Sequence, residues 1–156
     1  MKKFTFNLQS VLDHRQMLEE REQEKLVRIQ QEITLAEAGR QQLSNEIHEL
    51  RLQMARPEPG EIDVEKVTHV TRYMGKLEED VTTLVRKLSQ LEQQKRAQAD
   101  RVVEARRNRE VLESLKEKNF VQYERESNAM EQKLLDELST VKFALQDEQN
   151  LPVSKH

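Results

Sequence analysis

Four histidines and several adjacent glutamates are the residues of this chain that could do metal or acid–base chemistry. A helical metal site needs a second ligand about one turn away, yet no histidine here has a histidine or cysteine four residues from it. We therefore expect no metal centre. The histidines are His14, His48, His69 and His156.

The glutamates have a catalytic and a structural interpretation. Pairs such as Glu19–Glu20 and Glu78–Glu79 could act as general acid and base. Charged residues make up 35% of the chain, however, so these pairs are more simply the solvated faces of helices. The three glycines are isolated and form no phosphate-binding loop, and without cysteine there is no thiolate nucleophile or disulfide. We expect no enzyme activity, no cofactor and no small-molecule ligand.

The segment 86–118 is basic, with ten Lys or Arg residues against six Asp or Glu residues. Nucleic acid is one partner for such a segment, but the whole chain carries a net charge of −3. A helix face matched to an acidic first helix explains the segment better, so we expect no nucleic-acid binding. Arg106, Arg107 and Arg109 remain candidates for contacting an acidic protein.

The elements that position these residues follow from a narrow apolar seam with three-four spacing, which is typical of a coiled coil. Pro57, Pro59 and Gly60 interrupt it, and Gly60 would permit a positive φ at a chain reversal. The seam residues are Leu26, Ile29, Ile33, Ala36, Arg40, Leu43, Ile47, Leu50 and Met54 before the interruption, and Val67, Val70, Met74, Leu77, Val81, Leu84, Leu88, Leu91, Lys95, Gln98, Val102, Ala105, Arg109 and Leu112 after it.

The predicted fold is all-α, a long antiparallel two-helix coiled coil with an overhanging C-terminal helix. We expect helix 4–55, a hairpin tip at 56–62, helix 63–148 with an unpaired overhang at 117–148, and a flexible tail at 149–156. Asp63 is the expected N-cap of the second helix. In this single domain the numbers of facing seam residues add up to 120 or 121, as for Ile33 with Leu88.

The same register places acidic residues at 19–24 near Lys95, Arg96 and Arg101, and makes Arg40, Lys95 and Arg109 polar positions of the seam. At the N-terminus it places Leu8 opposite Leu112, and Phe4 and Phe6 near Leu115. Val11 and Leu12 compete for the next seam position. No run approaches the ~18 apolar residues of a membrane span, and the N-terminus lacks the apolar core of a signal peptide.

Two terminal motifs resemble those of the flagellar FliJ family. The opening FTFNLQSVLDHR has two aromatics, an apolar pair and a charged run. The stretch LESLKEKNFVQYERESNAMEQKLLDEL includes Glu131-Gln132-Lys133 and Asp136-Glu137, which are similar to that family's C-terminal pattern. The resemblance spans nearly the whole chain.

This resemblance implies a stalk similar to the rotary ATPase γ subunit, which inserts into the flagellar export ATPase hexamer, contacts the transmembrane export gate protein and escorts export chaperones. It implies a cytoplasmic protein held at the inner membrane through protein partners. The implied gate contacts are Tyr73, Leu77, Asp80 and Leu84. The implied ATPase-ring contacts are Phe4, Phe6, Leu8, Leu115, Phe120, Tyr123, Met130, Leu134 and Leu138.

Two other functions fit the helical pattern. A generic coiled-coil spacer would act through self-association. A stalk subunit of another rotary ATPase would require extra sequence between the helices, and the short connection at 56–62 argues against it.

Overall fold

The computed structural model describes residues 2–55, 60, 63–150 and 152. It contains two long helices that pack against each other, α1 (Gln9–Ala55) and α2 (Val64–Gln149). No strand occurs among the described residues. The all-α helical hairpin predicted from the sequence is confirmed. The chain divides into two compact units, Arg15–Arg107 and the combination of Met1–His14 with Asn108–His156, which are described separately below.

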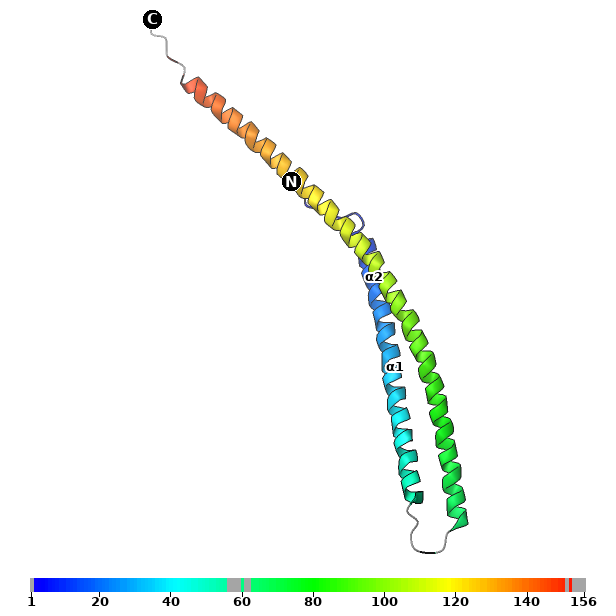
Figure 1. Cartoon of the computed structure of the whole chain (residues 1–156). Helices are drawn as coiled ribbons and strands as arrows, with labels where there is room; N and C mark the ends of the chain where they lie inside the picture. The colour runs from blue at the N-terminus through cyan, green and yellow to red at the C-terminus, as the bar shows by residue number, and fades with distance from the viewer. Residues whose placement is uncertain (1, 56–59, 61–62, 151, 153–156) are drawn as a thin grey trace. The chain divides into compact units, whose positions relative to one another are not determined.

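The unit Arg15–Arg107 is the hairpin, in which α1 and α2 lie side by side in opposite directions (Figure 1). Ile33, Ala36 and Leu91 form its buried core, with Ile29, Leu84 and Leu88 packed against them. Ile33 is only 2% exposed. These contacts confirm the predicted register, because Ile33 and Leu88 lie in the same cluster. Few of the described side chains are buried, which fits a narrow seam between two helices.

The second helix begins where the sequence predicts. The Asp63 carboxylate accepts the backbone N–H of Glu65 at 3.1 Å and lies 3.5 Å from the N–H of Lys66. Asp63 therefore satisfies N–H groups that have no partner within the helix, as an N-cap does. Most of the predicted tip (56–59, 61–62) and of the predicted tail (151, 153–156) lies outside the described residues. The chain reversal at which Gly60 would permit a positive φ therefore stays a prediction.

The first helix begins at Gln9, five residues later than predicted. Residues 2–6 are not helical, and the Phe6 carbonyl accepts the N–H of Gln9 at 3.0 Å in a turn. Thr5, Phe6 and Asn7 are weak helix formers, and a helix end has too few hydrogen bonds to compensate for them. The helix therefore begins at Gln9 rather than at Phe4.

One polar position of the predicted seam is wrong. Arg40 is exposed, and the preceding Gly39 is half-buried instead. A Cβ at Gly39 would lie 3.6 Å from Leu84, so α2 passes close to the backbone here. That distance is an ordinary van der Waals contact, so position 39 faces α2, and a guanidinium there would have to be desolvated. Lys95 and Arg109 are half-buried, as the sequence predicts.

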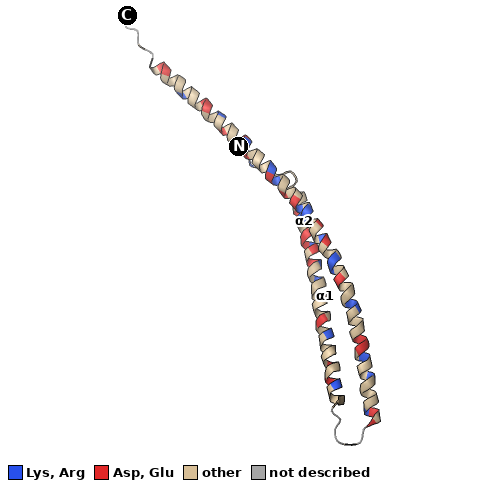
Figure 2. Ribbon diagram, viewed as in Figure 1, with Lys and Arg blue, Asp and Glu red and all other residues tan. Residues whose placement is uncertain are grey.

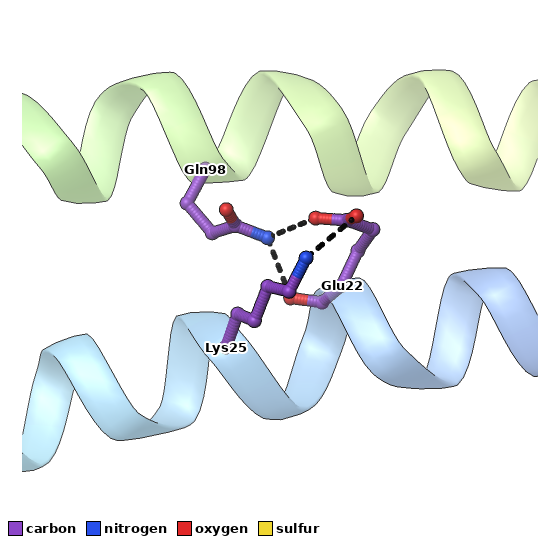
Figure 3. Close-up of polar contacts among 3 residues, drawn as sticks. All are labelled: Glu22, Lys25 and Gln98. Atoms are coloured by element: carbon purple, nitrogen blue, oxygen red, sulfur yellow. Dashed lines mark hydrogen bonds and ion pairs between the residues drawn. The ribbon is translucent and has the colours of Figure 1, made fainter.

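A polar layer between the helices was not predicted as such. The Gln98 amide, from α2, donates to the backbone carbonyl of Glu22 at 2.9 Å and to its carboxylate at 2.5 Å (Figure 3). Lys25 adds an ion pair to the same carboxylate at 3.3 Å. The hydrogen bond from Gln98 is the main reason that the pKa of Glu22 is lowered, and the charges of Lys25 and Arg101 lower it further.

A second polar contact lies nearby in the same unit. Glu19 is buried and its carboxylate forms an ion pair with Arg106 at 3.5 Å. The sequence predicted Lys95, Arg96 and Arg101 as the basic neighbours of this acidic stretch. Of these, Arg101 acts on Glu22 through its charge. Acidic and basic residues both occur along each of the two helices (Figure 2).

Candidate partner-binding surfaces

An aromatic cluster holds the N-terminal segment against α2 in the unit of Met1–His14 and Asn108–His156. The Phe4 ring lies edge-on to Phe120, with 5.2 Å between centroids, and 5.5 Å from the Tyr123 ring. The Tyr123 hydroxyl donates to the backbone carbonyl of Lys2 at 2.5 Å. We call residues 2–5 the strap. It is fixed to α2 by ring contacts and by one hydrogen bond.

The strap corrects two predictions. Phe4 was expected near Leu115 but contacts Phe120 and Tyr123, and the overhang was expected to be unpaired from residue 117. An extended chain advances about 3.3 Å per residue, against 1.5 Å in a helix, so a non-helical N-terminus reaches further along α2. The alternation in Phe4-Thr5-Phe6-Asn7 is the sequence signal for an extended segment that was missed.

The residues just after the strap divide into anchored and exposed side chains. Phe6 is buried, whereas Leu8 and Leu115 are each 39% exposed. Leu12 is buried and Val11 is exposed, which settles the choice that the sequence left open. Arg109, on the facing part of α2, forms an ion pair with Glu113 at 2.7 Å.

Beyond the strap, α2 carries a row of exposed apolar side chains. All residues from 128 to 149 are exposed, and Leu134 and Leu138 are each 58% exposed. They continue the three-four spacing of Phe120 and Tyr123, which places them on one helix face. We call this set the open stripe: Met130, Leu134, Leu138, Val141 and Leu145.

The open stripe has the composition of a protein-binding surface. Its side chains are hydrocarbon or thioether, and nothing in the described part of the chain covers them. Exposed apolar rows of this kind mark protein interaction sites. The segment 128–149 also contains five acidic and two basic residues, so its charge is negative.

The four residues implied as gate contacts are not all on the surface. Tyr73 is 46% exposed and Asp80 is exposed, whereas Leu77 is buried and Leu84 packs against the hairpin core. The Tyr73 hydroxyl donates to the Glu46 carboxylate at 2.5 Å. This hydrogen bond is the first cause of a raised pKa for Tyr73, since ionising the phenol would break it.

The described residues contain neither a metal-binding cluster nor a membrane-spanning helix. No group of three or more His, Cys, Asp or Glu side chains is placed to hold a metal ion among them. Neither helix, within the described ranges, has a stretch apolar enough to cross a bilayer.

Comparison with known proteins identifies the family. Neither a curated protein nor a solved structure matches the chain. The family model described as "Flagellar FliJ protein" matches residues 4–148, a range that contains Phe4 and Thr5 of the strap, all of α1, α2 except its last residue, and the open stripe. The chain therefore belongs to the flagellar FliJ family, whose members are structural components of the flagellar export apparatus.

Proposed function

We propose that the protein is the central stalk of the flagellar export ATPase ring, that it links this ring to the transmembrane export gate, and that it escorts export chaperones. The observation that carries the proposal is the open stripe, a row of exposed apolar side chains in a chain of this family. An apolar row held on a helix suits insertion among the subunits of a ring. The protein would work in the cytoplasm and reach the membrane through its protein partners.

A stalk of this kind does no chemistry itself. Its different faces meet chemically identical ATPase subunits, which makes the subunits inequivalent. If one face binds one subunit state more tightly, that state becomes more populated, and hydrolysis is coupled to the position of the stalk. The packed hairpin core around Ile33 supports this role, because a helix pair that bends would lose the coupling.

Two neighbouring leucines provide a matched test of ring binding. Leu134 belongs to the open stripe and Leu135 does not, yet they are 58% and 57% exposed. We expect Leu134→Ala to weaken binding to the purified flagellar export ATPase by roughly tenfold, because a central apolar anchor is lost. Leu135→Ala should leave the affinity unchanged. Equal effects of the two substitutions would refute ring binding through the open stripe.

Gate binding is a separate part of the proposal. Its exposed candidates are Tyr73 and Asp80, which lie in the hairpin unit and away from the open stripe in sequence. We expect Asp80→Ala to weaken binding to the purified cytoplasmic domain of the gate protein and to leave ATPase binding intact. Loss of both activities together would indicate a folding defect rather than a gate contact.

Self-association through the open stripe is the alternative function. A spacer would form stable dimers or larger oligomers, whereas a stalk would be a monomer until it meets the ring. Light scattering on the purified chain at micromolar concentration separates the two. A stable oligomer without effect on the ATPase would favour the spacer.

A further inference from the structure

We propose that the strap is a displaceable cover, which in the free protein masks the part of the apolar face at Phe120 and Tyr123 and so limits partner access to the full stripe. The partner in this inference is the export ATPase, so that part rests on the proposed function. The contacts that close the cover all lie in the unit of Met1–His14 and Asn108–His156.

The covered and open residues belong to one row. From Phe120 the helix face runs through Tyr123, the polar Ser127 and Met130 to Leu134, with spacings of three or four residues throughout. Phe120 remains 41% exposed with Phe4 against it, whereas Met130 is 67% exposed. A partner that packs along the whole row therefore meets the strap at one end of it.

Ring contacts and one hydrogen bond are the described contacts between the strap and α2. Residues 2–6 have no helical hydrogen bonds, the Phe4 ring meets Phe120 and Tyr123, and the Tyr123 hydroxyl donates to the Lys2 carbonyl. The Phe4 ring itself is only half-buried. These are contacts that a competing partner can replace, since it can offer Phe120 and Tyr123 other apolar groups.

The hinge of the cover is also defined. Phe6 is buried and its carbonyl is bonded to the N–H of Gln9, so the chain is fixed from Phe6 onward. Thr5 is exposed and lies between this anchor and the Phe4 ring. Rotation about the Thr5 backbone would release residues 2–4 and leave α1 in place.

The first arm of the test needs no partner. The chain contains no Trp, so Phe120→Trp introduces a single fluorescent reporter under the strap. Adding Phe4→Ala should raise the acrylamide quenching constant of this reporter by about two- to threefold, because the ring that shields it is gone. The matched control is Phe143→Ala, which removes an aromatic that is 69% exposed. Equal quenching with and without Phe4 would overturn the cover.

The second arm measures affinity for the purified export ATPase with the full-length chain. If about one molecule in ten has an open strap and only that form binds fully, Phe4→Ala should tighten binding by about tenfold. The substitution removes the free-energy cost of opening the strap. Phe143→Ala should not change it. Weaker or unchanged binding by Phe4→Ala would overturn the cover, since Phe4 would then be a direct contact or irrelevant.

A lock tests the same idea in the opposite direction. The chain has no cysteine, so Lys2→Cys with Glu124→Cys, joined by a flexible bismaleimide, ties the strap beside Tyr123. The joined form should bind the ATPase more weakly than the unjoined double variant, and equal binding would count against the cover. If no variant binds the ATPase at all, the proposed ring function fails, and the quenching result alone decides whether the cover exists.

Discussion

Truncation of Ile33 tests the hairpin core most directly. Ile33→Ala removes three carbon groups from a side chain that is 2% exposed, which costs about 2.4 kcal/mol at about 0.8 kcal/mol per buried carbon. The cavity left against Leu88 and Leu91 adds to this, and the better helix propensity of Ala subtracts a few tenths of a kcal/mol. We expect a loss of about 3 kcal/mol in the free energy of unfolding.

Urea unfolding followed by circular dichroism at 222 nm would measure this loss, and the slope of the transition should stay the same. Leu35→Ala is the control, because Leu35 is 73% exposed on the same helix and should change stability by less than about 0.5 kcal/mol. The double variant with Leu88→Ala should be non-additive, since both side chains line one cluster. A cost below about 1 kcal/mol, or independent costs for Ile33 and Leu88, would refute the core and its register.

Three other expectations concern the caps, the polar layer and the open stripe. Asp63→Ala should cost about 1 kcal/mol in urea unfolding, because two N–H groups of α2 lose their acceptor; an unchanged midpoint would contradict the N-cap. The pKa of Glu22 is lowered on folding by its bond from Gln98, so it stabilises the fold above the ordinary glutamate pKa of about 4.3, and this contribution disappears as the pH falls. The stability difference between wild type and Glu22→Gln should therefore shrink between pH 7 and pH 3, and a constant difference would argue against the bond. Leu134→Ala and Leu135→Ala should both leave thermal stability unchanged, since both side chains are exposed; a loss for Leu134 alone would mean that the stripe is covered within the free protein.

The parts of the fold that local signals determine were predictable from the sequence. Pro57 and Pro59 end one helix pattern, Asp63 caps the next, and the three-four spacing of apolar residues defines the seam. The register followed from comparing the two halves of that pattern. The helix ends and the seam depend on residues close in sequence, and the register needed only the assumption that the two halves of the seam face each other.

The missed features depend on how the helices rotate against each other. Arg40 and Gly39 fit the spacing almost equally well, and only the approach of Leu84 decides between them. Gln98 was placed on the seam, but its pairing with the carbonyl and carboxylate of Glu22 requires the facing backbone to be in position. The strap was missed because the heptad pattern was extended to Phe4, although its alternating residues favour an extended chain.

The candidate binding site could be predicted only in part from the sequence. The sequence located the apolar row from Phe120 onward, but a row alone does not tell which residues are covered. The structure separates Tyr123, which contacts Phe4 and bonds to Lys2, from Leu138, which is open. The gate residues show the same difficulty, because Leu77 lies on the seam and is buried.

The same three-four spacing of apolar residues on α2 serves both folding and partner binding. Whether another part of the chain covers a residue decides which of the two it serves. Where α1 lies over the row, as at Leu91, truncation removes buried surface and lowers stability. Where the row is open, as at Leu134, the same truncation removes nothing that the free protein uses, so its effect is confined to partner binding. Phe120, covered by Phe4 yet still 41% exposed, lies between these limits. If a partner packs along the whole row, it must break the strap contacts and none of the hairpin core, so we expect that opening the strap strengthens binding without weakening the hairpin.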